Sequence, residues 1–339
     1  MTPLISVIIP AYNAEKMIGS TLQSILEQDY ENIEVIIIDD ASTDNTGTAA
    51  KTVLNTSGKQ WQIIRHNENK GECASRNTGM LEAQGAYIVF IDSDDLVDRD
   101  FLSILYGVAL EKDTDIAFCG YRMIECKTGE ETLNHVTLDP EKIYSGEELA
   151  LIYLTRKFIT SVCAMLFRSD FLLSSGVRFK EGCISGGDTE FIIKILSGSQ
   201  RVAFVNKYSY VYRLHENMGS RADNVSHDQK VQRSSDSFQG LIRAAGYMAG
   251  HTRTKKIINE ARYRYLPKYY LKMFNVYSWG GEYDTFINTL SSPEIRSILW
   301  SSYKVFFEEP QLFLKTLWLL SFPKMYYEHR RKHEYFYEI

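Results

Sequence analysis

Three aspartates, Asp92, Asp94 and Asp95, fall within four residues directly after the apolar run 87–91. Carboxylates this crowded repel one another, and a bound divalent cation offsets that repulsion. Mg²⁺ and Mn²⁺ prefer hard oxygen ligands and are often held by one or two carboxylates together with a substrate diphosphate. The cluster therefore predicts a site for a metal–diphosphate complex. A polar turn or a helix cap, with Asp95 as the cap, is the alternative.

A second acidic cluster, Asp39 and Asp40, follows the apolar run 36–38. A carboxylate that faces a nucleobase accepts a hydrogen bond from a ring N–H, so one of the two is predicted to contact the edge of uracil or guanine. Ser42 or Thr43 suits the cap of the next helix, and capping alone is the competing explanation.

Two further segments carry groups suited to a nucleotide. Tyr12 follows the first apolar run and offers a ring for stacking on a base, with Pro10 as a rigid entry into the next helix. A turn at Gly71 precedes another helical stretch, and Lys70 and Arg76 are predicted to contact a diphosphate. Solvated surface charge is the alternative for this second segment.

The elements that must position these residues are short apolar runs alternating with stretches of helical periodicity. Near-continuous apolar strands are typical of a sheet covered on both faces, so the alternation predicts a doubly wound, mostly parallel α/β sheet of the Rossmann-like kind. Ligands of such sheets bind at the carboxyl ends of the strands, where the polar clusters lie. The predicted strands span residues 5–9, 33–38, 61–65, 87–91, 116–119, 162–167 and 202–212.

The same pattern predicts two domains, a core over residues 1–215 and a mostly helical region over residues 216–339. The polar segment 127–146 predicts a connecting loop, followed by a helix at about 147–156. A further helix is predicted at 190–196.

Composition narrows the class of protein. The chain has 339 residues, 44% of them hydrophobic and 24% charged, as in ordinary folded domains. The net charge of −5 offers no general attraction to nucleic acid. The five cysteines include no Cys-x-x-Cys pair, which favours a reducing compartment over a disulfide framework or a zinc site. Neither a signal peptide nor a membrane-spanning run is expected, so a cytoplasmic location is predicted.

Taken in order, the motifs resemble those of the family 2 glycosyltransferases of the GT-A fold. The matching segments are Val7-Ile8-Ile9-Pro10-Ala11-Tyr12-Asn13, Asp39-Asp40-Ala41-Ser42-Thr43-Asp44, Arg76-Asn77-Thr78-Gly79 and Phe90-Ile91-Asp92-Ser93-Asp94-Asp95. The resemblance implies a nucleotide-diphosphate sugar donor, with UDP-sugars favoured, and a glycan or lipid-linked acceptor in surface polysaccharide synthesis. The residues expected to contact the donor are Pro10, Tyr12, Asn13, Glu15, Asp39, Asp40, Ser42, Lys70, Gly71, Arg76, Asp92, Ser93 and Arg213.

Two later segments are also similar to the family. Gly186-Gly187-Asp188-Thr189-Glu190-Phe191 resembles its Glu-Asp-x-x-Phe region, whose Asp is the general base, so the resemblance assigns that role to Asp188. Gly187 stands where Glu is usual, and Glu190 is the alternative base. In the segment after the last core strand, the resemblance implies a phosphate contact for Arg213 and a metal contact for His215, with structural roles as the alternative. The implied metal ligands are Asp92, Asp94 and His215.

These residues predict one mechanism. Asp92 and Asp94 position Mn²⁺ or Mg²⁺ at the leaving diphosphate while Asp188 takes the proton of an acceptor hydroxyl, and in-line displacement inverts the anomeric centre. A nucleotidyltransferase or a dinucleotide-dependent oxidoreductase would show a Gly-rich loop after the first strand, which this chain lacks. A non-catalytic nucleotide-sugar-binding partner in a polysaccharide assembly is the alternative that Gly187 encourages.

Basic and aromatic residues interleave in the C-terminal region. Residues 243–272 hold eight Lys or Arg against Glu260 alone, with tyrosines among them, and residues 318–332 repeat the pairing. Such surfaces suit the headgroups of anionic lipids, so peripheral contact with the inner face of the cell membrane is predicted, with a solvated helix face as the alternative. Nucleic acid is disfavoured because no recognised binding module accompanies the charges.

Overall fold

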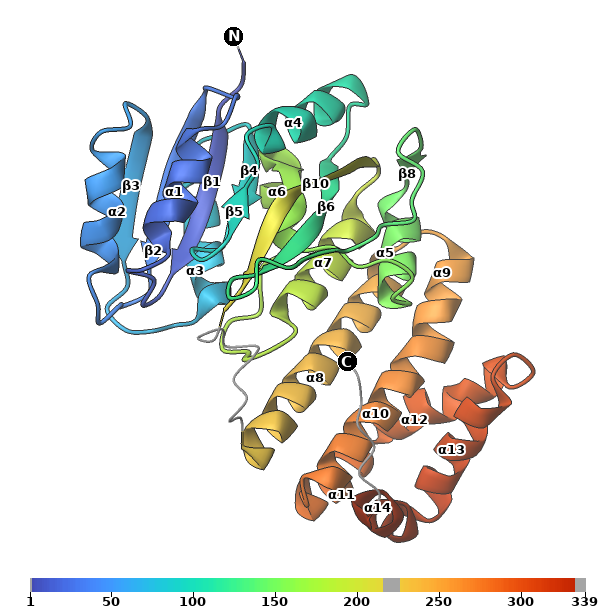
Figure 1. Cartoon of the computed structure of the whole chain (residues 1–339). Helices are drawn as coiled ribbons and strands as arrows, with labels where there is room; N and C mark the ends of the chain where they lie inside the picture. Colours follow the sequence, from blue (N-terminus) through green and yellow to red (C-terminus); the bar gives the residue numbers. More distant parts are fainter. Residues whose placement is uncertain (1, 216–225, 333–339) are drawn as a thin grey trace. The chain divides into compact units, whose positions relative to one another are not determined.

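The computed structural model describes residues 2–215 and 226–332. These residues form two compact units (Figure 1). Residues up to 182, together with those from 198 to the end of the last strand, form the first unit. Residues 183–197 and the helices from residue 226 onward form the second. The strand pattern of the sequence assigns residues 183–197 to the first domain, whereas their contacts group them with the helices.

The first unit is built on one sheet with the strand order β3-β2-β1-β4-β9-β6-β10-β5, with β7 beside β6 and β8 beside β10. The six strands β1 to β4, β6 and β10 run in one direction and the others run against them, so the sheet is mixed and mostly parallel, as the sequence predicts. The strands are β1 (Ile5–Ala11), β2 (Ile33–Asp39), β3 (Gln60–Arg65), β4 (Tyr87–Phe90), β5 (Leu96–Val97), β6 (Ile116–Glu125), β7 (Glu131–Leu133), β8 (Ile143–Tyr144), β9 (Met165–Arg168) and β10 (Val202–Leu214).

Every residue of β1 and β2 is buried, which requires cover on both faces of the sheet. The parallel register pairs Ala11 with Asp39 and Ile8 with Phe90, so the loops that follow β1, β2 and β4 leave the sheet at one edge. The helices of this unit are α1 (Ile18–Leu26), α2 (Thr46–Leu54), α3 (Glu72–Glu82), α4 (Phe101–Glu111), α5 (Gly146–Leu154) and α6 (Ser169–Ser174), with a 3-10 turn η1 (Val162–Ala164).

Two predictions about this sheet are wrong in detail. The strand predicted at 162–167 begins only at Met165, because Ser161 caps the turn η1 by accepting a hydrogen bond from the backbone N–H of Cys163. The loop predicted at 127–146 contains the short strands β7 and β8, which add to β6 and β10. All three residues of β7 are exposed, so it has no apolar pattern that the sequence could reveal.

The second unit is helical. Its central helix α10 packs against α8, α11, α12 and α14, and its core holds aromatic side chains that include Phe238, Phe274 and Tyr326. The elements are α7 (Gly187–Gly198), α8 (His227–His251), α9 (Lys255–Asn259), a π-helical turn η2 (Glu260–Tyr265), α10 (Leu266–Trp279), α11 (Tyr283–Leu290), α12 (Pro293–Trp300), a 3-10 turn η3 (Ser301–Val305), α13 (Pro310–Ser321) and α14 (Pro323–Lys332). Three of the helices begin at a proline, whose fixed φ suits the first turn. Within the part of the chain that the structure describes, none of the helices combines the length and the apolar character needed to cross a bilayer.

Candidate active site

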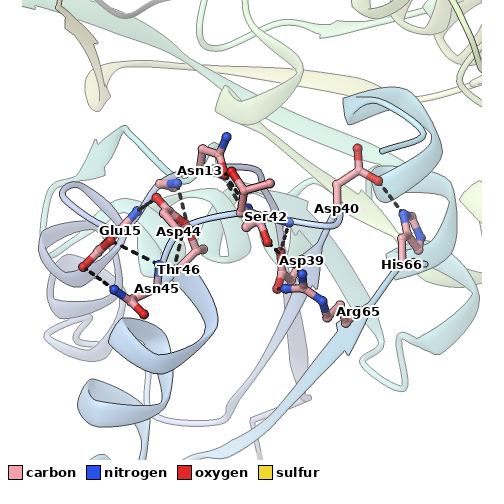
Figure 2. A network of polar contacts seen from close by, with 12 residues as sticks. Asn13, Glu15, Asp39, Asp40, Ser42, Asp44, Asn45, Thr46, Arg65 and His66 are labelled. Carbon is pink, nitrogen blue, oxygen red and sulfur yellow. Dashed lines mark hydrogen bonds and ion pairs between the residues drawn. The ribbon is translucent and has the colours of Figure 1, made fainter. Parts of the chain in front are cut away.

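The loops that follow β1 and β2 are tied to each other (Figure 2). The backbone N–H of Asn13 donates to the Ser42 hydroxyl at 3.0 Å. The side-chain oxygen of Asn13 accepts a hydrogen bond from the backbone N–H of Thr43 at 2.7 Å. The Glu15 carboxylate accepts from the backbone N–H of Asn45 at 3.1 Å. Asn13 and Glu15 thus hold the two loops in register, while Tyr12 keeps 49% of its surface exposed and available for stacking.

Asp39 closes the second loop on itself. One of its oxygens accepts from the backbone N–H of Ser42 at 2.9 Å and the other pairs with the Arg65 guanidinium, which also donates to the Ser42 carbonyl at 2.7 Å. The turn needs a positive φ at Ala41. The predicted helix cap is wrong, because α2 begins at Thr46 and the Ser42 hydroxyl accepts from Asn13 instead.

Asp40 is buried and anchors the turn before α3. Its carboxylate accepts from the backbone N–H groups of Lys70 at 2.9 Å and Gly71 at 2.7 Å, and contacts His66 Nδ1 at 2.6 Å. His66 Nε2 lies 3.0 Å from the Thr78 hydroxyl. The backbone N–H groups of Lys70 and Gly71 are therefore hydrogen-bonded to a carboxylate of the protein itself. Sequence reasoning missed His66, because a single histidine after a strand has no distinguishing pattern.

Arg76, on α3, lies beneath the first aspartate of the Asp-x-Asp motif. Its side chain is fully buried and donates to Asp92 Oδ1 at 2.7 Å, and its guanidinium lies 5.3 Å from the centre of the Phe179 ring. It also pairs with Glu72, one helical turn earlier. A buried guanidinium thus compensates the charge of Asp92. The predicted contact of Arg76 with a diphosphate stays a prediction.

The other two aspartates differ from each other. Asp94 is 33% exposed, and its Oδ2 lies 2.9 Å from His215 Nε2. Asp95 is buried and accepts from the Tyr210 hydroxyl at 2.5 Å and from the backbone N–H of Arg213 at 2.8 Å. Burial and the two neighbouring aspartates raise the pKa of Asp95 well above its usual range. Asp95 is therefore a structural anchor to β10, and Asp94 is the exposed member of the pair.

Arg213 joins three elements of the first unit. Its guanidinium donates to the backbone carbonyl of Asp94, to the Ser20 hydroxyl at 2.8 Å and to the Thr21 hydroxyl at 3.1 Å. Thr21 in turn donates to the backbone carbonyl of Ser93 at 2.9 Å. Burial lowers the pKa of Arg213 from its usual value. The phosphate contact expected of Arg213 stays a prediction, and Ser20 and Thr21 gave no signal in the sequence.

The predicted base lies in the second unit. Asp188 is half-buried in the first turn of α7. Two residues on, Glu190 is buried and accepts from Arg243 at 2.7 and 3.0 Å and from Lys194 at 2.5 Å. Both carboxylate oxygens of Glu190 are thus occupied by cationic side chains, which disfavours Glu190 as the alternative base. The role of Asp188 stays a prediction.

The predicted metal ligands fit an ion that is bound jointly with a substrate. Asp92 and Asp94 are 23% and 33% exposed, and Asp94 lies beside the imidazole of His215. Among the described residues, no three His, Cys, Asp or Glu side chains gather as a group that could hold a metal ion. Mg²⁺ typically takes one or two carboxylates and completes its coordination with substrate phosphates and water. The donor set suits that arrangement better than a permanently enclosed ion.

A mostly parallel sheet with acidic loops at one edge, in a chain that also has a helical C-terminal unit, is the architecture of the GT-A fold. Residues 6–172 match the family described as Glycosyl transferase family 2. The chain is 31% identical over 224 residues to the glycosyltransferase GlyG of Streptococcus pneumoniae serotype 4, a match that covers 63% of this chain and 71% of GlyG. The chain belongs to glycosyltransferase family 2, as the resemblance in its sequence implies.

Other similar proteins differ in length or sequence. The match to the glycosyltransferase GlyA of the same organism is 31% identical and covers 64% of this chain but only 31% of GlyA. Residues 1–349 of S. aureus TarS, solved with UDP-GlcNAc, superpose with a TM-score of 0.67 at 19% identity, covering 98% of this chain and 93% of that one. The mannosyltransferase PcManGT of Pyrobaculum calidifontis, solved with GDP-Man and Mn²⁺, gives 0.54 at 16% identity, covering 96% and 88%. These likenesses confirm the predicted fold.

Proposed function

We propose that this chain transfers a sugar from a nucleotide-diphosphate donor, with a UDP-sugar favoured, to a hydroxyl of a glycan or lipid-linked acceptor. The proposed setting is the synthesis of surface polysaccharide on the cytoplasmic side of the cell membrane. One observation carries the proposal. Asp92 and Asp94 lie on one loop, where Arg76 donates to Asp92 and His215 lies beside Asp94. This loop leaves the sheet at the same edge as the loops that follow β1 and β2. The UDP-GlcNAc bound to TarS supports a nucleotide-sugar donor.

For the nucleobase, the hydrogen bonds favour Asp39 over Asp40. A carboxylate has about four acceptor positions. Asp40 uses them on His66 and the two backbone N–H groups of the turn, one of which contacts both oxygens. Asp39 takes one contact on each oxygen from the described residues. Asp39 thus keeps capacity for the N–H of a base, with Tyr12 free to stack on its ring.

For the transfer itself, Asp92, Asp94 and His215 would hold Mn²⁺ or Mg²⁺, which when bound neutralises charge on the leaving diphosphate. The Mn²⁺ in PcManGT supports this choice of ion. Arg76 orients Asp92, and Arg213 fixes the backbone of Asp94. Asp188 accepts the proton of the acceptor hydroxyl, and in-line attack inverts the anomeric centre.

The test is Asp94→Asn, assayed for donor hydrolysis and transfer with Mn²⁺ against a panel of UDP- and GDP-sugars. Loss of the charge should lower metal-dependent turnover by roughly a hundredfold to a thousandfold, since stabilisation of the leaving group is lost. The melting temperature should change little, because Asp94 is partly exposed. Asp113→Asn is a matched control, since that side chain is 78% exposed in the same unit. Full activity of Asp94→Asn, or a retained anomeric configuration in the product, contradicts the proposal.

The alternative is a non-catalytic nucleotide-sugar-binding partner, which Gly187 favours because a carboxylate usual in the family is missing there. It predicts that UDP binds to the wild-type protein in isothermal titration, with neither hydrolysis nor transfer under any metal or donor. The Asp94→Asn and Asp188→Asn variants would then match the wild type in every turnover assay.

A further inference from the structure

The last helices of the second unit expose large apolar side chains that touch one another. Phe307, two residues after the end of η3, is 97% exposed, and Trp300 and Leu314 are at least half exposed. Trp300 contacts Phe313 with ring centroids 6.0 Å apart, Phe313 contacts Phe306 at 5.5 Å, and Phe306 contacts Phe307 at 5.5 Å. We call these four aromatic residues, together with Leu314, which follows Phe313 on α13, the α12–α13 surface. Exposed apolar residues that are joined in this way are typical of a binding surface.

The surface continues along α13, which packs on α10, α12 and α14 (Figure 1). One face of α13 is buried through Leu312, Thr316 and Leu319, at the spacing of successive helical turns. Leu314 and Phe322 stay exposed, although both are as apolar as the buried face. The helix thus has more apolar surface than its own unit covers.

The charges around this surface are mostly positive. Residues 300–332 contain six basic side chains, at 304, 315, 324, 330, 331 and 332, and three acidic ones, at 308, 309 and 328. Glu308 and Glu309 both pair with Arg264, which also pairs with Glu260, so the three glutamates share one cation. The positive excess of the segment comes from Lys315 on α13 and from the basic residues of α14. Lysines that flank exposed rings complement an anionic partner.

The basic and aromatic residues at 243–272 do not form such a surface. Tyr265 and Tyr269 are buried in the core of the unit, and Tyr263 and Tyr270 are half-buried. Arg243 and Arg264 are engaged in ion pairs with acidic side chains. Segment 243–272 therefore lacks the exposed aromatic side chains that the predicted membrane contact would use, whereas the α12–α13 surface has them.

We propose that the α12–α13 surface binds the headgroup region of an anionic phospholipid bilayer, with its rings among the headgroups and Lys304 and Lys315 near the lipid phosphates. The contact is peripheral, because it uses side chains on the outside of short helices. It requires no nucleotide, so it stands or falls independently of the proposed transfer reaction.

The experiment is sedimentation of the full chain with vesicles of phosphatidylcholine, alone or mixed with phosphatidylglycerol. The wild-type protein is expected to bind the mixed vesicles, to bind the neutral ones weakly, and to dissociate as salt is raised. Phe307→Ser combined with Leu314→Ser should weaken binding by about tenfold or more, as expected from the apolar area removed. Lys315→Gln should weaken binding to the mixed vesicles only. Leu110→Ser is the matched control, because Leu110 on α4 in the first unit is 62% exposed, close to the 55% of Leu314.

Several outcomes would overturn the inference: no binding of the wild type to mixed vesicles, equal binding of the double variant, or equal loss in Leu110→Ser. Sedimentation velocity is run in parallel. A wild-type dimer that the double variant disrupts would assign the surface to a second copy of the chain and also overturn it. UDP titration of each variant checks folding. If the wild type fails to bind UDP yet binds vesicles, the proposed function falls and the lipid surface remains.

Discussion

The loops at the edge of the sheet and the helices of the second unit are held by different interactions. In the loops, the buried carboxylates Asp40 and Asp95 each accept at least two hydrogen bonds from elements distant in the sequence. Asp39 accepts one from within its own loop and one from Arg65 on β3. In the helices, ring contacts dominate, such as Phe274 with Phe286 at 5.1 Å. Hydrogen bonds to a carboxylate are directional and position individual atoms, whereas ring packing tolerates several geometries. The first region is therefore built to hold atoms in place.

One part of the helical unit resembles the loops in this respect. The segment before and within α7 is held to α8 by Glu190 with Arg243, by the Ser185 and Ser237 hydroxyls 2.9 Å apart, and by the backbone N–H of Ile184 on Asp236 at 2.9 Å. This segment carries Asp188. Directional bonding at that position is what a general base with a defined orientation requires.

The largest expected effect comes from Phe274→Ala, which breaks the packing of the helical unit. Phe274 is fully buried, and removing its ring leaves a cavity that should lower the free energy of unfolding by roughly 3–5 kcal/mol. UDP affinity of the folded protein should stay unchanged, because the proposed donor contacts lie in the first unit. Urea denaturation and isothermal titration measure the two quantities, with Phe274→Leu as the milder control. A loss of UDP affinity would show that the two regions are not separable.

Arg76→Met is expected to lower the free energy of unfolding by less than Phe274→Ala does, but to weaken UDP binding as well. The change keeps much of the side-chain volume and leaves Asp92 without its buried partner. Because Asp92 is 23% exposed, the cost should be roughly 2–3 kcal/mol, below that of breaking a fully buried pair. UDP affinity in Mn²⁺ should fall at the same time. Lys142→Met breaks a pair with Glu148 in which both side chains are exposed, at 46% and 44%, and should cost less than about 1 kcal/mol. Equal costs for the two variants would contradict the role given to Arg76.

The smallest effect, taken over a single pH unit, concerns pH and tests the burial of one residue of the sheet. Burial raises the pKa of the Cys119 thiol from 9.0 to about 12. As pH rises above 9.0, the thiol of the unfolded chain loses its proton while the thiol of the folded protein keeps it. The contribution of Cys119 to the free energy of unfolding is therefore fully present below pH 9.0 and declines towards pH 12. The decline is about 1 kcal/mol per pH unit. Cys119→Val should flatten the decline relative to the wild type in urea unfolding, whereas Cys126→Val, at an exposed position, should not. Parallel slopes for wild type and Cys119→Val would refute this.

By itself, the sequence determined the sheet and the order of its motifs. Runs such as 33–38 and 87–91 indicate buried strands because a continuous apolar run is a local pattern, visible in consecutive residues. The acidic residues at their ends could be located for the same reason. The turn η1, which delays the start of β9, and the exposed strand β7 could not be located, because contacts with distant segments decide them.

Only the tertiary structure decided which donor pairs with each aspartate of the site. Arg76 with Asp92, His66 with Asp40 and Arg213 with Asp94 join residues on different elements, and no local pattern encodes which donor reaches which carboxylate. In the helical unit, the same aromatic types are buried at Tyr269 and exposed at Phe307. Helical periodicity shows that a residue lies on a face, but the packing of distant helices determines whether that face is covered.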